Sequence, residues 1–317
     1  MTADKTTEER FQEVIGQDKL KRKLNFLLDG HEKTERLPHL GFFAAKGCGK
    51  TFVAKLVKDY VVGDNGRGML IDSSTLQRNP IDFIEGFYNT KVRGKNVYVV
   101  FDEAHNIPKT LASGIFLSMF QKQSMNDPHI SINIPEYDGT IDLDLRKQKF
   151  AFATTDPDRI FAPLRDRMKI LNFEPYNNAQ LSQIVEQNCE SVIFLDNVLE
   201  DISEVLRGSP RKAIDVSQDI VTYCENKCNS EFGPAQWKDL VDIMTVNPVG
   251  LEDDEFRYLK EIKSRGGEIT VSSMAAVLNH PRTVVQEIEK FLIQRDLLKI
   301  GTNSIRHLTP KGYKIQA

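Results

Sequence analysis

The chain has 317 residues, of which 40% are hydrophobic and 27% charged, a composition typical of a globular protein too long for one compact core. No stretch approaches 18 apolar residues, and the polar start "MTADKTTEERF" lacks the apolar segment of a signal peptide, so we expect a cytosolic protein with no membrane partner. Four scattered cysteines exclude a disulfide framework, and the formal charge of −3 means that any nucleic-acid surface must be local.

Short, almost continuously apolar segments alternate with helical patterns in the first half of the chain. Strands that are buried on both faces have this pattern. The segments are "HLGFFA" (39–44), "GMLIDSS" (68–74), "NVYVVFDE" (96–103), "KFAFATT" (149–155) and "MKILNFE" (168–174). Because helices separate them, we predict an α/β fold with a parallel sheet and helices on both faces.

A glycine-rich stretch, "AAKGCGKT" (44–51), joins the first predicted strand to an amphipathic helix. In that context Gly47 and Gly49 allow backbone N–H groups to point at phosphate oxygens. Lys50 would neutralise the β and γ oxygens, and the Thr51 hydroxyl would face Mg²⁺. Ala44 replaces the usual first glycine, which matters only if that residue needs positive φ, where a Cβ costs roughly 1–2 kcal/mol. The alternative is a chance glycine-lysine helix start.

Two adjacent carboxylates follow the third predicted strand in "VYVVFDEAH". The carboxyl ends of parallel strands face the ligand, so Asp102 is expected to hold the Mg²⁺ shell and Glu103 to polarise the attacking water. His105 is interpreted as a helix-capping or solvated residue rather than a sensor of the nucleotide.

The segment 129–145, "HISINIPEYDGTIDLDL", alternates with period two around Asp138-Gly139. This pattern predicts a β-hairpin inserted between two strands of the sheet.

The second half of the chain has a different organisation. From about Asn177 to Thr245 strand signals vanish and period-3.6 patterns predict a small helical domain. After a proline- and glycine-containing linker, the order helix, "EITV" strand, two helices and two strands around "TNS" predicts a winged helix. The predicted domains are a large nucleotide-binding domain at 1–174, a helical lid at 175–246 and a winged-helix domain at 247–317.

The winged-helix segment reverses the sign of the global charge. From residue 280 to the end there are seven Lys and Arg residues against three acids, a local surplus of four. Winged helices bind duplexes through a helix and a basic wing. The predicted double-stranded DNA contacts are Arg282, Lys299, Arg306 and Lys311. The alternative is a winged helix that binds only protein.

Several stretches together resemble the AAA+ ATPases and, within them, the RuvB Holliday-junction branch-migration motors. They are "VIGQDKLKRKL" (14–24), "DEAH" (102–105), "ATTDPDRIFAPLRDRMKI" (153–170), "FEPYNNAQLSQIV" (173–185), "RGSPRKAI" (207–214) and "FLIQRDLL" (291–298). The resemblance spans nearly the whole chain and implies ATP and Mg²⁺ as cofactors. It also implies a bacterial cell, or a phage-encoded protein that acts in the bacterial cytoplasm.

The resemblance implies further site residues. Thr155 matches the polar sensor that orients water near the γ-phosphate. Arg167, with Arg165 as the less favoured candidate, matches the arginine finger that reaches the next subunit's site, which implies a homo-oligomeric ring, expected to be a hexamer. Arg211 matches the second sensor, which couples nucleotide state to the lid. The implied nucleotide-binding set is Ile15, Gly16, Gly47, Cys48, Gly49, Lys50, Thr51, Phe52, Tyr176 and Arg211.

The sequence departs from the RuvB pattern at Ala45 and Lys46 in the loop and at Asp156 after the sensor threonine. The 129–145 hairpin occupies the segment through which RuvB proteins engage RuvA, although the sequence "PEYDGT" differs from that of the family at this place. We therefore treat a RuvA-like partner as one candidate for this hairpin.

The function that this sequence indicates is an ATP-driven ring motor on double-stranded DNA, such as four-way junctions. Two alternatives stay open at this stage. The first is a clamp-loader-type AAA+ protein that loads or remodels a protein partner on DNA. The second is a nucleotide-binding assembly module without productive hydrolysis, which the presence of Lys50, Glu103, Thr155 and Arg167 disfavours.

Overall fold

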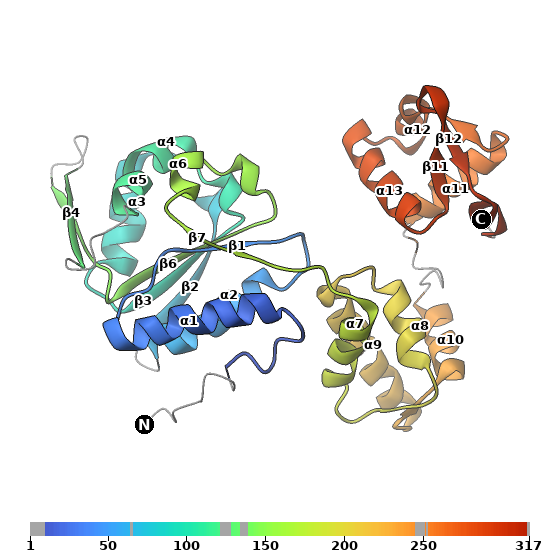
Figure 1. Cartoon of the computed structure of the whole chain (residues 1–317), viewed down its shortest axis with the longest axis horizontal. Coiled ribbons are helices and arrows are strands. Elements are labelled where there is room, and N and C mark those ends of the chain that lie inside the picture. The colour runs from blue at the N-terminus through green and yellow to red at the C-terminus, as the bar shows by residue number, and fades with distance from the viewer. Residues whose placement is uncertain are drawn as a thin grey trace. The chain divides into compact units, whose positions relative to one another are not determined.

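The computed structural model describes residues 10–63, 66–120, 128–133, 139–244, 251 and 253–315 (Figure 1). The chain forms two compact units: residues 1–191 with 208–222, and residues 192–207 with 223–317. Each unit is described by itself. The division into three domains at residues 174 and 246 stays a prediction, because the two units divide the helical segment between them.

A five-stranded sheet forms the centre of the first unit, and all of its paired strands are parallel. The strand order is β2-β3-β6-β1-β7. The five apolar segments of the sequence are therefore all strands, as predicted. Their bounds are β1 (Leu40–Phe43), β2 (Arg67–Asp72), β3 (Val97–Asp102), β6 (Gln148–Thr154) and β7 (Lys169–Asn172).

Side chains on β6 alternate between the two faces of the sheet. Phe150 and Phe152 belong to one hydrophobic cluster, and Ala151 and Ala153 to the other. The small alanines let the helices that begin the unit approach closely, while the phenylalanines pack with other aromatic rings under the opposite layer. Figure 1 shows α1 and α2 on one side of the sheet and α3 to α6 on the other. The prediction of helices on both faces of the sheet is therefore confirmed.

The helices of the first unit precede, connect and follow these strands. The helical segment that follows β2 begins as α-helix at Pro80, and its longer part, from Ile84 to Val92, has π-helical hydrogen bonding. The α-helices are α1 (Asp18–Thr34), α2 (Lys50–Val62), α3 (Pro80–Phe83), α4 (Lys109–Leu111), α5 (Leu117–Met119), α6 (Ala162–Arg165) and α7 (Asn178–Gln187), with the first part of α9 (Pro210–Lys227).

The inserted hairpin is formed by β4 (His129–Asn133) and β5 (Thr140–Asp144). The strands are antiparallel, with His129 opposite Asp144 and Asn133 opposite Thr140. The hairpin prediction is confirmed. Its expected turn at Asp138 lies outside the described residues.

The second unit contains α8 (Val198–Val205), α10 (Pro234–Ile243) and the carboxyl-terminal fold. The expectation that strands vanish between 177 and 245 was wrong in one detail, since β8 (Ile193–Phe194) and β9 (Glu231–Phe232) pair in parallel. Two-residue strands bury too few side chains to leave a periodic signal.

The carboxyl-terminal fold is the predicted winged helix. The strands β10 (Glu268–Ile269), β12 (Arg306–Leu308) and β11 (Leu298–Ile300) form a three-stranded antiparallel sheet in that order. The helices α11, α13 and α12 share one core with it. The helix bounds are α11 (Asp253–Ser264), α12 (Val271–Leu278), α13 (Arg282–Gln294) and a final short helix α14 (Pro310–Lys314).

Within the described ranges, no helix is long and apolar enough to cross a membrane.

Candidate functional site

The glycine-rich loop leaves the buried strand β1 and enters α2. Gly47 and Gly49 have φ angles of 83° and 85°, the left-handed region that favours glycine, and Gly49 is the residue before the helix. Ala44 does not have positive φ. The missing first glycine therefore causes no backbone strain, and the loop keeps the conformation that directs N–H groups outward at a helix start.

Lys50, the first residue of α2, is only 6% exposed. Its Nζ donates to the carbonyl oxygens of Ala44 and Ala45, at 2.9 and 3.0 Å. Burial lowers the pKa of Lys50, while the charges of Glu103 and Asp102 act in the opposite direction. No carboxylate among the described residues lies within 4 Å of this ammonium. A buried cation held only by carbonyl groups is well suited to receive an anion.

Thr51 and Asp102 are held together, since the Thr51 hydroxyl donates to Asp102 Oδ2 at 3.1 Å. Asp102 ends β3, beside the loop. A hydroxyl and a carboxylate suit Mg²⁺, which usually takes only one or two carboxylates and completes its shell with phosphate and water oxygens. Within the described parts of the chain no three His, Cys, Asp or Glu side chains gather as a cage for a metal ion.

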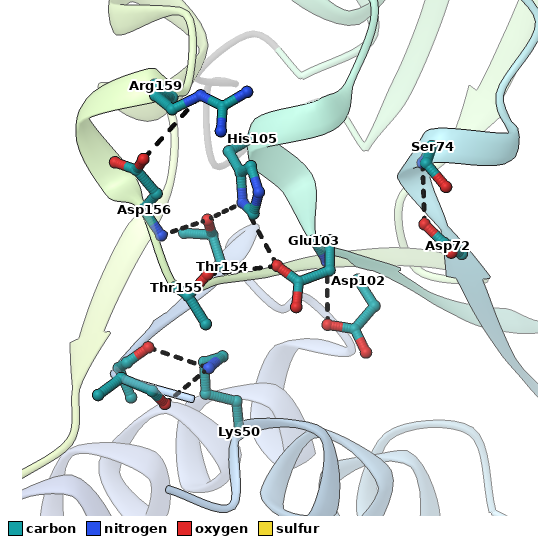
Figure 2. A network of polar contacts seen from close by, with 12 residues as sticks. Lys50, Asp72, Ser74, Asp102, Glu103, His105, Thr154, Thr155, Asp156 and Arg159 are labelled. Atoms are coloured by element: carbon teal, nitrogen blue, oxygen red, sulfur yellow. Dashed lines mark hydrogen bonds and ion pairs between the residues drawn. The ribbon is translucent and has the colours of Figure 1, made fainter. Parts of the chain in front are cut away.

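Glu103 follows Asp102 in a left-handed conformation, with φ of 46°. Its carboxylate Oε2 accepts from the Thr155 hydroxyl at 3.4 Å and lies 3.4 Å from His105 Nδ1. Figure 2 shows the Glu103 carboxylate joined to both of these residues, with Asp102 and Lys50 nearby. The two carboxylates, the two hydroxyls and the lysine named from the sequence therefore do gather at the carboxyl edge of the sheet.

The interpretation of His105 as a capping or solvated residue was wrong. Its side chain is 11% exposed, and Nδ1 lies 2.8 Å from Thr154 Oγ1 (Figure 2). The pairing of the strands explains this contact: β3 and β6 are neighbours with Phe101 opposite Phe152, so the turn after β3, which carries His105, lies beside Thr154 at the end of β6. The sequence alone did not give that pairing.

A cavity of about 450 Å³ lies beside the loop, wholly within the first unit. This volume is in the range of small-molecule and cofactor sites. Arg211 lines it, and the Arg211 N–H donates to the Gly47 carbonyl at 3.4 Å. The other predicted nucleotide-binding residues that line it are Ile15, Gly47, Gly49, Lys50, Thr51, Phe52 and Tyr176.

Gly16 and Cys48 are not among the residues that line this cavity. Gly16 instead lies against α7, where a Cβ would come within 2.4 Å of the Gln180 side chain. Burial raises the pKa of the Cys48 thiol, which favours its neutral form. A direct role of these two residues in binding stays a prediction.

The two candidate finger arginines lie in different surroundings. Arg165 donates to Asp158 Oδ1 at 3.1 Å and to the Pro157 carbonyl at 3.2 Å. Arg167 donates to the Pro163 carbonyl at 2.6 Å and has no carboxylate within 4 Å among the residues described here. Neither lines the cavity of its own chain.

The predicted DNA surface needs one correction, at Arg306. This residue is 6% exposed, and its Nε and Nη2 donate to the two carboxylate oxygens of Glu289, both at 2.8 Å. Arg306 lies on β12 with its side chain in the interior. It therefore forms a structural ion pair with Glu289 and does not contact phosphate. Arg282, Lys299 and Lys311 are exposed.

The strand order, the glycine loop that leads into α2, the Asp102-Glu103 pair and the Thr155 hydroxyl just past the adjacent strand β6 define a P-loop ATPase of the AAA+ type. A family model described as the Holliday junction DNA helicase RuvB P-loop domain matches residues 7–173. A second, the RuvB C-terminal winged helix domain, matches residues 248–316. The chain belongs to the RuvB family.

Individual relatives agree with this membership. A Holliday junction branch migration complex subunit RuvB from Rickettsia africae is 27% identical over 306 residues, which cover 91% of this chain and 83% of the relative. A solved Thermotoga maritima RuvB mutant has a TM-score of 0.72 at 22% identity, covering 98% of this chain and 97% of its own. The Thermotoga maritima RuvB Holliday junction branch migration motor has a TM-score of 0.72 at 22% identity, covering 96% and 95%. These structures share the fold.

Proposed function

We propose that this chain is an ATP-driven motor that forms a ring on double-stranded DNA and branch-migrates four-way junctions. The observation that supports it best is the buried Lys50 ammonium, which is hydrogen-bonded only to backbone carbonyls and feels the charges of Glu103 and Asp102 from beyond salt-bridge distance. This arrangement fits a magnesium-bound triphosphate. The match of residues 248–316 to the RuvB winged-helix domain supports DNA as the substrate of the motor.

When bound, ATP with Mg²⁺ supplies a phosphoryl group whose transfer to water releases free energy. Lys50 neutralises phosphate charge, and Thr51 and Asp102 hold the cation. Glu103 accepts a proton from the attacking water, and Thr155 orients that water. All five side chains come from the first turn of α2 or from strand ends of one sheet, so each is fixed by the packing of the helix and the sheet.

Arg167 is proposed as the arginine that completes the neighbouring subunit's site. Its guanidinium is free of carboxylates, whereas Arg165 is occupied within its own segment. Since it does not line its own chain's cavity, it would act in trans, which requires a ring, proposed to be a hexamer. Arg211 lines the cavity and would report the nucleotide to the helical lid.

Arg282, Lys299 and Lys311 are proposed as phosphate contacts of the winged helix. Three exposed cations give weak, salt-sensitive binding that does not depend on sequence. A ring would multiply this affinity through avidity. The 129–145 hairpin is proposed as the docking element for a RuvA-like partner. The cytosolic location stays a prediction.

The test is a synthetic four-way junction with homologous arms, incubated with ATP and with wild-type protein or Glu103→Gln, with and without RuvA. The wild type should separate the junction into two duplexes. Glu103→Gln should bind ATP and the junction but hydrolyse ATP at least about 100-fold more slowly, because it lacks the general base. Hydrolysis without junction movement under both conditions would favour a loader. Unimpaired hydrolysis by Glu103→Gln would remove Glu103 from its role.

A further inference from the structure

We propose that His105 is a positioning residue for the general base: through its Nδ1–H it directs the Glu103 carboxylate, while Thr154 holds the imidazole ring. This inference deepens the proposed function and rests on Glu103 acting as the base. It concerns two side chains that neither the sequence motifs nor the family match assigns to the reaction. Figure 2 shows the three residues in one continuous polar network.

The ring of His105 is fixed from one side. His105 Nδ1 lies 2.8 Å from Thr154 Oγ1, and the Asp156 backbone N–H donates to the same oxygen at 3.0 Å. Thr154 is fully buried at the end of β6, so its hydroxyl is as rigid as the sheet. The imidazole therefore hydrogen-bonds to the neighbouring strand and not to the backbone of its own turn, which excludes a capping role.

The protons of this network can be assigned from the charge of Glu103. If Nδ1 carried a lone pair, that lone pair would face the Glu103 carboxylate at 3.4 Å and repel it. If Nδ1 carries the proton, it donates to Thr154 Oγ1 and attracts the carboxylate at the same time. Thr154 Oγ1 has two lone pairs, one for Asp156 N–H and one for His105 Nδ1–H. An ionised Glu103 thus selects the Nδ1–H tautomer.

The two contacts of the Glu103 carboxylate direct it without neutralising it. Both the Thr155 hydroxyl and His105 Nδ1 approach Oε2 at 3.4 Å, whereas a strong hydrogen bond to a carboxylate is about 2.7–2.9 Å long. A close bond would lower the basicity that the reaction needs. Two long contacts from different elements set the direction of the carboxylate and leave its lone pairs available for a proton.

The contact from His105 also helps to offset the cost of an unusual backbone conformation at Glu103. Glu103 has a left-handed φ of 46°, which is uncommon for a residue with a long side chain. The contacts from Thr155 and His105 hold the carboxylate of this residue from two different segments of the chain.

Three variants of His105 test the proposal. His105→Ala should lower the kcat for ATP about 10- to 100-fold with the KM and the affinity for an ATP analogue unchanged, because a misplaced base affects turnover and not binding. His105→Asn keeps an N–H on Cγ, where Nδ1 is attached, and should stay within about 3-fold of wild type. His105→Gln places its amide one bond further out and should resemble His105→Ala. Wild-type turnover by His105→Ala, or equal turnover of Asn and Gln variants, overturns the proposal.

A second measurement does not depend on turnover. In protein labelled with ¹⁵N-histidine, the His105 Nδ1 resonance, assigned by its loss in His105→Asn, should be that of a protonated nitrogen, and Thr154→Val should shift it. A lone-pair Nδ1 resonance overturns the inference even if the protein is an active ATPase. Should the wild type hydrolyse no ATP, the proposed function fails, and the resonance still decides the tautomer.

Discussion

Lys50 in the nucleotide loop and Arg306 in the wing are both 6% exposed and both cationic, yet they have opposite surroundings. Arg306 meets both oxygens of the Glu289 carboxylate, and Glu289 also accepts from the Tyr258 hydroxyl at 3.0 Å. Lys50 meets two backbone carbonyls. The buried charge of Arg306 is already compensated by the protein, whereas that of Lys50 is left for an anion to compensate.

His39 shows a third way to bury a basic group. Its ring packs against the rings of Phe120 and Phe150, and full burial lowers its pKa from 6.5 to about 4. It therefore stays neutral near pH 7. Taken together, the three groups show that burial alone does not identify a binding residue, and that the nature of its partners does.

The largest effect is expected from removing the compensated cation. Arg306→Met leaves Glu289, which is 3% exposed, as an unpaired buried charge, and should lower the free energy of unfolding by about 3–5 kcal/mol. The loss can be followed by urea unfolding with the fluorescence of Trp237, the only tryptophan, which lies in the same unit.

Two controls sharpen this result. Lys299→Met, an exposed change on β11, should alter the unfolding free energy by less than about 0.5 kcal/mol. The double variant Arg306→Met with Glu289→Met should recover much of the loss, because no unpaired charge remains. A loss below about 1 kcal/mol for Arg306→Met alone would show that the ion pair is not structural.

A smaller effect is expected from pH. The unfolded chain binds a proton at His39 with a pKa of 6.5, and the folded chain only at about 4, so stability is full above pH 6.5 and falls as the pH decreases toward 4. Between pH 7 and pH 5 this amounts to about 2 kcal/mol. His39→Phe should remove that part of the slope, which can be measured by urea unfolding at both pH values. An unchanged slope would mean that His39 does not cause this loss of stability at low pH.

The smallest effect is expected at the exposed cations. Changing Arg282, Lys299 and Lys311 together to Glu should weaken duplex binding by about 10-fold or more at low salt, and should flatten the salt dependence of binding. Basal ATP hydrolysis should not change, because these residues lie far along the chain from the loop and belong to the other unit. Binding can be measured by fluorescence anisotropy. If the affinity for duplex DNA were unchanged, these three residues would not be part of the DNA-binding surface.

The parallel sheet could be predicted from the sequence because each strand is buried on both faces and leaves a continuous apolar segment. The loop and the Asp102-Glu103 pair could be predicted because contiguous residues form them. By contrast, His105 and Thr154 are 49 positions apart, and only the β3-β6 pairing brings them together.

Arg306 illustrates the limit of counting charges. In the sequence it is one of seven basic residues of a positive segment, and nothing local distinguishes it from Lys299. The distinction comes from the side of the strand on which it lies and from Glu289, which is 17 residues away on α13. A three-residue strand is too short for alternation to indicate which side chains point inward.

The most direct test of the central claim compares wild type with Lys50→Met in thermal unfolding, each with and without a non-hydrolysable ATP analogue and Mg²⁺. The wild type should be stabilised by the ligand. Lys50→Met, which removes a buried charge that has no carboxylate at salt-bridge distance among the described residues, should be at least as stable as wild type without ligand and should gain almost nothing from it. If the ligand stabilised Lys50→Met as much as the wild type, the buried lysine would not be the group that receives the phosphates.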